Sequence, residues 1–202
     1  MIENWINKRY LNEVSELNQS FNRSKPYQHL IIKDLFNRNK LSLLRKEVLK
    51  EKFERQDTDL FSFSQTKELF ASKNKFVKEF YVFLSSKEFI AFIKGLTGEK
   101  LGDKIDMHAH QYKQGDYLLF HDDKLENRKI AYVINLSTGF NPEDGGKLQL
   151  YNIKKPIKPA KEILPEFNSL VLFKVSNKSL HAVEEVITKK ERLGLGGWFY
   201  GP

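Results

Sequence analysis

Eight short stretches of β-forming residues, separated by turn sequences, occupy the second half of the chain and constrain its fold more than any other feature. The segments 113–116, 141–146 and 176–179 are rich in residues that favour turns, such as Gly, Asn, Asp and Ser. A run of short strands at this spacing favours a double-stranded β-helix, the rolled two-sheet architecture of jelly rolls and cupins. We expect the strands at roughly 105–112, 117–122, 130–137, 147–151, 158–163, 169–175, 181–187 and 192–200.

The first half of the chain is predicted to be mainly helical. The spacing of apolar residues indicates helices over 1–23, 39–52 and 74–96, the last broken near Ser85 and Ser86, with short strands at 29–32 and 59–63. The expected fold class is α+β with a mainly β core, in which the N-terminal helices pack on the outer face of one sheet. A chain of 202 residues is long enough for one domain of ordinary size. We expect a single domain over 1–202, with helical support over 1–100 and the β-helix core over 105–200.

The composition narrows the chemistry that the chain can perform. The chain has no cysteine, so any metal ion must be held by His, Asp or Glu. The formal net charge is +8, but the lysines are scattered, and we therefore expect a solvated basic surface and no direct nucleic-acid binding. The N-terminal segment lacks the apolar core of a signal peptide, and no apolar run is long enough to span a bilayer. We expect a cytoplasmic protein without a membrane partner.

The strand predicted at 117–122 ends in the sequence His121-Asp122-Asp123. Side chains two positions apart in a strand point the same way, so His121 and Asp123 can converge while Asp122 faces away. An imidazole and a carboxylate are two of the three ligands of the facial triad that binds non-haem Fe(II). His181, at the start of a later strand, is the candidate for the third ligand. Taken alone, the His-x-Asp sequence is more typical of a polar turn at a strand end.

Arg192 is the one arginine in the last third of the chain and opens the last predicted strand. A turn at 188–190 would place it opposite residues near Val186, deeper in the barrel than His181. An offset of a few residues corresponds to a distance on the order of 10 Å along a strand. A five-carbon diacid could therefore chelate a metal at one end and meet the planar guanidinium at the other. Without the histidines, a surface arginine after a lysine-rich turn would be the simpler interpretation.

The strand predicted at 105–112 has two different faces. Ile105, Met107 and Ala109 share one face, which suits packing against helices, and His108, His110 and Tyr112 share the other. An H-x-H pair on a strand also occurs in cupin metal sites, but no glutamate follows at the cupin spacing. We therefore expect His108 and His110 to line the pocket.

Several sequence blocks, in chain order, resemble the Fe(II)- and 2-oxoglutarate-dependent oxygenases. The His121-x-Asp123 pair, the distal His181 and Arg192 follow that family's order. The blocks LLFHDD, RKIAYVINLS, GGKLQLY, NSLVLFKVSNKSLHAVEEV and RLGLGGWFYG resemble the prolyl hydroxylase branch, in particular the ribosomal-protein prolyl hydroxylases. The matching blocks run from about 105 to 201, which corresponds to the catalytic domain of those enzymes.

The resemblance implies a set of cofactors and residue roles. Fe(II) would be held by His121, Asp123 and His181, and the far carboxylate of 2-oxoglutarate would pair with Arg192 and with the hydroxyl of Tyr112. Dioxygen would be the second cosubstrate, with ascorbate as an optional reductant. The implied reaction is hydroxylation of a prolyl residue in a protein substrate, a ribosomal protein or a translation factor, with release of succinate and CO2. The segment 54–74 is predicted to be the flexible element that grips the substrate peptide.

One departure from the family and two alternative functions accompany this interpretation. Asn135 stands where similar enzymes carry a tyrosine near the cosubstrate, and Trp198, predicted to pack in the core, stands where oxygenases of alkylated nucleic acid carry a second arginine. The tryptophan argues against nucleic-acid repair. The other alternative is a non-catalytic, cupin-like binding module, and the complete set of His121, Asp123, His181 and Arg192 argues against it.

Overall fold

The computed structural model describes residues 2–202. The helices are α1 (Arg9–Asn12), α2 (Val14–Arg23), α3 (Arg38–Val48), α4 (Lys75–Leu84) and α5 (Lys87–Thr97), with 3-10 turns at Ile2–Asn4, Leu69–Ala71 and Pro142–Asp144. The strands are β1 (His29–Lys33), β2 (Phe53–Asp57), β3 (Phe61–Thr66), β4 (His108–Tyr112), β5 (Tyr117–His121), β6 (Arg128–Asn135), β7 (Leu148–Leu150), β8 (Lys161–Ile163), β9 (Ser169–Lys174), β10 (His181–Val183) and β11 (Arg192–Tyr200). All eight strands predicted in the second half are present as β4 to β11. Each helix within residues 2–202 is too short or too polar to cross a membrane.

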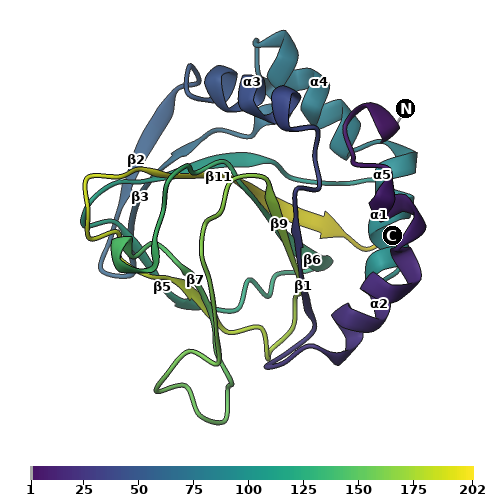
Figure 1. The fold of residues 1–202 in the computed structure, drawn as a ribbon. Helices are drawn as coiled ribbons and strands as arrows, with labels where there is room; N and C mark the ends of the chain where they lie inside the picture. Colours follow the sequence, from purple (N-terminus) through teal and green to yellow (C-terminus); the bar gives the residue numbers. More distant parts are fainter. Residues whose placement is uncertain (1) are drawn as a thin grey trace.

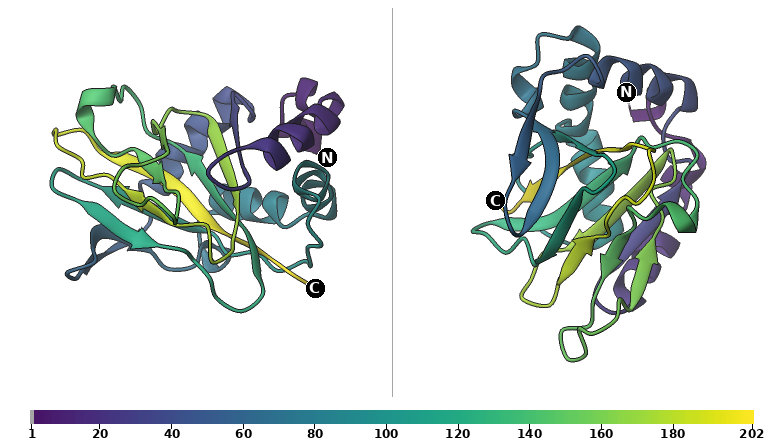
Figure 2. Two further views of the ribbon diagram at one scale, coloured as in Figure 1. Left: turned by 90° about the horizontal axis from the view of Figure 1, so that it is seen from below. Right: turned by 90° about the vertical axis from the view of Figure 1, so that its left-hand side faces the viewer.

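The strands form one antiparallel sheet that rolls up on itself (Figure 1). The strand order is β1-β9-β6-β11-β4-β3-β5-β10-β7-β8, with β2 paired on β3. One end of β3 pairs with β4 and the other end pairs with β5, so the sheet bends there into a larger and a smaller half. The long strand β11, drawn in yellow, runs through the middle of the larger half to the C-terminus (Figure 2). This is the double-stranded β-helix that the spacing of the short strands predicts.

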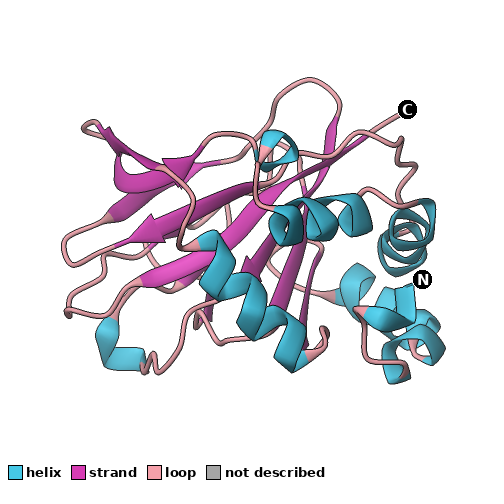
Figure 3. Cartoon of the chain, turned by 90° about the horizontal axis from the view of Figure 1, so that it is seen from above, coloured by secondary structure: helices cyan, strands magenta, loops and turns pink. Residues whose placement is uncertain are grey.

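The helices cover the outer face of the larger half-sheet (Figure 3). Alternate residues of strand β6 belong to two separate hydrophobic cores. Ile130 and Ile134 face outward and pack with the helices, whereas Ala131 and Val133 face the interior of the barrel. Strand β4 follows the same rule, with Ala109 in the outer core and Tyr112 in the inner one. The two-faced pattern predicted for this segment is therefore confirmed for these residues. The interior face is the one that can line a pocket.

Side-chain caps mark the start of α4 and, at the break predicted near Ser85 and Ser86, the start of α5. The side chain of Asn74 caps the start of α4 by accepting hydrogen bonds from the backbone of Phe76 and Val77. Ser86 caps α5 in the same way by accepting a hydrogen bond from the Phe89 backbone N–H. The two caps fix two short amphipathic helices against the outer face of the sheet.

Two expectations about the chain's path are wrong, and one segment is more regular than its sequence indicates. The helix predicted over 1–23 is regular only in α1 and α2, because residues 2–8 form a 3-10 turn and a bridge, and the backbone leaves the helical conformation again at Glu13. The segment 54–74, which is loop-like in sequence, contains most of the β2–β3 hairpin, and the guanidinium of Arg55 pairs with the Asp116 carboxylate at 2.8 and 2.9 Å; its role in gripping a substrate peptide stays a prediction. Strand β11 does not form a hairpin with β10, because it pairs with β4 and β6 while β10 pairs with β5 and β7. Strands β10 and β11 therefore lie in opposite halves of the barrel.

Candidate metal and cosubstrate site

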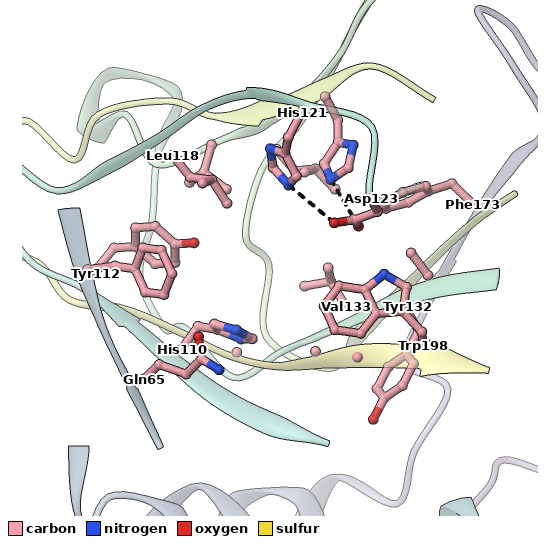
Figure 4. Close-up of a pocket in the computed structure, with 18 of the residues that line it drawn as sticks. Gln65, His110, Tyr112, Leu118, His121, Asp123, Tyr132, Val133, Phe173 and Trp198 are labelled. Atoms are coloured by element: carbon pink, nitrogen blue, oxygen red, sulfur yellow. Dashed lines mark ion pairs between the residues drawn. The ribbon is translucent and has the colours of Figure 1, made fainter. Parts of the chain in front are cut away.

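Three predicted metal ligands meet at one end of the barrel. The Nε2 atom of His121 lies 3.6 Å from one carboxylate oxygen of Asp123, and the Nε2 atom of His181 lies 3.4 Å from the other (Figure 4). One ligand atom from each of the three residues lies within 4.8 Å of the others. The pairing of β5 with β10 produces this convergence, since His121 and His181 are direct partners in the ladder. Two histidines and one carboxylate on one side of a point are the donor set of the facial triad.

The orientation of the Asp123 side chain does not follow from strand alternation. Strand β5 ends at His121, and Asp123 lies two residues beyond it with a positive φ of 60°. A left-handed conformation is tolerated by Asp more readily than by most residues, because its short polar side chain can interact locally. The turn at Asp123, together with the strand that precedes it, therefore aims the carboxylate at the two imidazoles.

Backbone carbonyls orient both imidazoles. The Nδ1–H of His121 donates to the Leu119 carbonyl at 2.8 Å, and the Nδ1–H of His181 donates to the Ser179 carbonyl at 2.7 Å. Because a carbonyl oxygen only accepts, the hydrogen of each neutral ring sits on Nδ1, and the lone pair of Nε2 points to the Asp123 side. This is the tautomer that a metal ion requires of a histidine ligand.

The protonation states of Asp123 and His121 also suit the binding of a metal cation. Burial on its own raises the pKa of Asp123, but the adjacent His181 and then His121 lower this pKa to about 2. Burial and then the neighbouring His181 lower the pKa of His121. The site therefore presents an ionised carboxylate and a neutral His121 imidazole, the states in which both residues bind metals.

A buried hydroxyl ties the two ligand-bearing segments together. Ser179 is fully buried, and its Oγ shares its hydrogen between the carbonyls of Asp122 at 2.8 Å and Ser176 at 2.6 Å, while it accepts the Ser176 N–H at 3.0 Å. The bond to Asp122 joins the turn that carries Asp123 to the turn that precedes His181. Ser179 therefore sets the separation of two of the three candidate ligands.

Arg192 lies in the same pocket as the three candidate ligands, on the opposite half of the barrel. The side chain is 4% exposed, and its Nε has no hydrogen-bond partner anywhere in residues 2–202. Its Cζ lies 4.9 Å from the ring centroid of Tyr112, its direct partner across the β11–β4 ladder. Burial lowers the pKa of Arg192, the nearby Tyr112 opposes that shift, and no carboxylate acts on it. A buried guanidinium without an anionic partner is costly, so this position is suited to a carboxylate from a ligand.

Part of the floor of the pocket, formed by strand β11, carries no side chains. Gly194, Gly196 and Gly197 of β11 line it and contribute no side chain, which leaves space between Arg192 and the His121–Asp123–His181 cluster. Residues of both halves close its walls. A ligand could therefore span from the cluster to the guanidinium.

The sequence of residues 107–200 matches the family described as the 2OG-Fe(II) oxygenase superfamily. Residues 107–200 are a 2OG-Fe(II) oxygenase domain. Prolyl 3-hydroxylase OGFOD1 of Mus musculus is 35% identical over 182 residues, which cover 88% of this chain and 33% of that protein. Prolyl 3,4-dihydroxylase OGFOD1 of Ostreococcus tauri is 33% identical over 201 residues, which cover 87% of this chain and 38% of that protein. The chain thus spans 33% to 38% of the length of these curated relatives.

Solved structures of the superfamily share the fold. A Trichoplax adhaerens prolyl hydroxylase, solved with a peptide fragment of the hypoxia inducible factor oxygen degradation domain, superposes with a TM-score of 0.76 at 17% identity, covering 96% of this chain and 93% of that one. A Pseudomonas putida prolyl-4-hydroxylase superposes with a TM-score of 0.74 at 15% identity, covering 94% of this chain and 100% of that one. These likenesses confirm the double-stranded β-helix.

The residues of this chain fit the two groups in the superfamily's name. The two Nε2 atoms and the Asp123 carboxylate form a donor set for Fe(II), and Arg192, on which no carboxylate of residues 2–202 acts, provides a seat for one carboxylate of 2-oxoglutarate. Tyr112, predicted by resemblance to assist Arg192, lies beside it and lines the same pocket. The expected position of Arg192 opposite Val186 is wrong, since its ladder partner is Tyr112.

Not every residue that the sequence predicts to line the pocket does so. His110 lines it, but His108 turns toward Glu68, where its Nε2 lies 3.3 Å from the carboxylate and its Nδ1 lies 3.2 Å from the Thr66 carbonyl. The prediction that His108 lines the pocket is therefore wrong. Asn135 is buried but is not a lining residue, and its amide donates to Ser169 Oγ at 2.9 Å.

The sequence alone did not place three aromatic residues that shape the site. Trp198 lines the pocket and turns its indole nitrogen toward Asp123, with Arg128 stacked 3.3 Å from the ring centroid (Figure 4). The ring centroid of Phe173 lies 4.6 Å from that of His181, and Phe63 stacks on Tyr112 at 5.1 Å. Inward alternation on β3, β9 and β11 is the signal that could have identified them, but it gives no information on which residues of opposite half-sheets meet.

Proposed function

We propose that this chain is an Fe(II)- and 2-oxoglutarate-dependent dioxygenase that hydroxylates a prolyl residue of a protein, with a ribosomal protein or a translation factor as the expected substrate. One C–H bond of the substrate, 2-oxoglutarate and O2 are converted to an alcohol, succinate and CO2. One oxygen atom of O2 enters the alcohol and the other enters succinate. The observation that carries the proposal is a triad of His121, Asp123 and His181 in the same pocket as a buried Arg192 without an anionic partner.

Each of these residues has a defined task. His121, Asp123 and His181 hold the iron on one side and leave the pocket side open for ligands. Arg192 pairs with the far carboxylate of 2-oxoglutarate, and the hydroxyl of Tyr112 donates to the same carboxylate. Iron bound at this site supplies the oxidising chemistry together with dioxygen. The aromatic walls formed by Phe63, Phe173 and Trp198 exclude water from the reacting centre.

The substrate class rests on the relatives. Proteins named prolyl 3-hydroxylase and prolyl 3,4-dihydroxylase align with most of this chain, and the segment that matches the family, 107–200, contains all five site residues. The ribosomal or translational substrate follows from the resemblance of the GGKLQLY and HAVEEV blocks to ribosomal-protein prolyl hydroxylases.

Mass spectrometry of peptides tests the reaction. The purified chain is incubated with Fe(II), 2-oxoglutarate, ascorbate and 18O2, and with a proteome-derived peptide mixture. We expect proline-containing peptides to gain one 18O atom and an equal amount of labelled succinate to appear. Turnover of 2-oxoglutarate without modified proline would overturn the substrate class, and incorporation into nucleic-acid alkyl groups would favour the repair alternative.

A matched pair of histidine variants makes this test specific. His29 is buried, and its Nδ1 lies 2.9 Å from the carbonyl two residues earlier, as in the two candidate ligands, but it does not belong to the metal cluster. We expect His121→Ala to abolish turnover and His29→Ala to retain it in the folded protein. Loss of turnover in both variants at equal stability would contradict the assigned roles.

A further inference from the structure

His110 occupies the middle of the pocket floor. It pairs with Gln65 of β3 on one side and with Gly194 of β11 on the other, and all three residues line the pocket. A Cβ atom added to Gly196 would lie 3.3 Å from His110 Cε1, so the ring extends over the open floor left by the glycines. His110 is thus a polar side chain placed along the path between the metal cluster and Arg192.

His110 differs from the other four histidines in its hydrogen bonding. His29, His108, His121 and His181 each place Nδ1 within 3.2 Å of a backbone carbonyl oxygen. Neither ring nitrogen of His110 has such a partner in residues 2–202, and the half-buried ring lines the pocket. A polar ring that faces a pocket without a hydrogen-bond partner from the protein is available to a ligand.

The surroundings of His110 define what that ligand must be. Burial, followed by the positive charges of His108 and Arg192, lowers the pKa of His110 to about 3, and Asp123 opposes the shift. The ring therefore lies within electrostatic reach of both Arg192 and Asp123, and at neutral pH it is uncharged with one N–H to donate. A neutral donor between a guanidinium and a metal cluster suits a carboxylate or keto oxygen of a ligand that bridges them.

We propose that His110 is a further cosubstrate-positioning residue, whose ring N–H donates a hydrogen bond to an oxygen at the metal-facing end of 2-oxoglutarate. Arg192 fixes the far carboxylate, and His110 fixes the rotation of the chain between the two ends. The inference rests on the proposed function, since it assigns a contact to that reaction's cosubstrate.

Binding of 2-oxoglutarate to the Fe(II)-loaded protein without oxygen tests this contact. The titration uses wild type, His110→Phe, which fills the same space without a donor, and His110→Asn, which keeps one. We expect the Kd for 2-oxoglutarate to rise about ten-fold or more in His110→Phe and to recover in part in His110→Asn, since a hydrogen bond to a charged group is worth about 1.5–3 kcal/mol. The Kd for Fe(II) should stay unchanged in both variants.

A neighbouring histidine provides the control. His108→Phe alters the residue two positions along the same strand, whose partners are Glu68 and Thr66, and it should leave the Kd for 2-oxoglutarate unchanged. An unchanged Kd in His110→Phe would overturn the inference, and a raised KM for the peptide alone would assign His110 to the protein substrate. Failure of the wild type to bind 2-oxoglutarate would instead overturn the proposed function itself.

Discussion

Arg192 lies directly across the β11–β4 ladder from Tyr112, with its Cζ 4.9 Å from the tyrosine ring centroid and its Nε without a partner in residues 2–202. This relationship places a fixed positive charge inside a largely apolar barrel. The protein retains the charge at the expense of stability, because an unpaired buried cation is destabilising. The arrangement is useful only when an anion binds.

Replacing Arg192 should therefore separate binding from stability. We expect Arg192→Met to weaken 2-oxoglutarate binding by about a hundred-fold or more, while the free energy of unfolding stays the same or increases, since a buried unpaired charge is removed. Isothermal titration and urea denaturation of the same samples measure the two effects. Tyr112→Phe, which removes only the hydroxyl, should weaken binding by about ten-fold. A large loss of stability in Arg192→Met would contradict this role.

Ser179→Ala should weaken Fe(II) binding without altering any ligand. The substitution removes the bond from Ser179 Oγ to the Asp122 carbonyl, which couples the Asp123 turn to the His181 segment. We expect a ten- to hundred-fold loss of metal affinity, as is typical of residues that orient metal ligands. Ser176→Ala is the control, since its exposed hydroxyl accepts only from the Lys178 N–H. Equal Fe(II) affinities in the two variants would show that the coupling is unimportant.

His108 should make stability depend on pH near neutrality. Burial lowers the pKa of His108, but the hydrogen bond to Glu68, the Thr66 carbonyl and the nearby acidic charges outweigh it, so the folded-state pKa is raised. A raised pKa stabilises the fold fully below the unfolded value of about 6.5, and this contribution is lost as the pH rises through the folded value. Urea denaturation at pH 5.5 and pH 8.5 should show a larger loss of stability in wild type than in His108→Phe. Equal losses of stability in wild type and His108→Phe would show that the ion pair of His108 with Glu68 does not contribute to stability.

Gly145 is predicted to be irreplaceable for steric reasons. Its φ is 72°, and an added Cβ would lie 2.0 Å from the carbonyl oxygen of Glu185, which is a severe clash with backbone. Gly115 has a similar φ of 86° but open space around it. We expect Gly145→Ala to destabilise the protein by more than about 3 kcal/mol and Gly115→Ala by about 1 kcal/mol, as measured by thermal or urea unfolding. Similar losses of stability in the two variants would show that the positive φ, and not the clash with Glu185, causes the effect.

The sequence identified the elements and the site residues better than their spatial relations. Period-two alternation and turn signals located β4 to β11, and the spacing of histidine, aspartate and arginine located the site. Strand pairing was harder, because residues 188–190 resemble a hairpin turn although β10 and β11 belong to opposite half-sheets. Alternation predicted the direction of the Asp123 side chain, but a left-handed backbone beyond the strand end determines it.

His108 and the β2–β3 hairpin illustrate the other limit. The sequence placed His108 and His110 on one strand face, but the carboxylate of Glu68, from a distant segment, draws His108 out of the pocket. Arg55 is likewise paired with Asp116, 61 positions away, and this contact joins the β2–β3 hairpin, which appears loop-like in sequence, to the residue that precedes β5. Both features depend on long-range ion pairs, which local patterns do not encode.

The central claim is that His121, Asp123 and His181 hold Fe(II) while 2-oxoglutarate spans from the metal to Arg192. The most direct measurement is an anaerobic titration of the Fe(II)-loaded chain with 2-oxoglutarate, following the visible charge-transfer band of a chelated ferrous site. We predict a saturable band in wild type that disappears in His121→Ala and requires far higher 2-oxoglutarate in Arg192→Met. A folded, iron-supplied wild type without the band, or a band that persists unchanged in His121→Ala, would contradict the account.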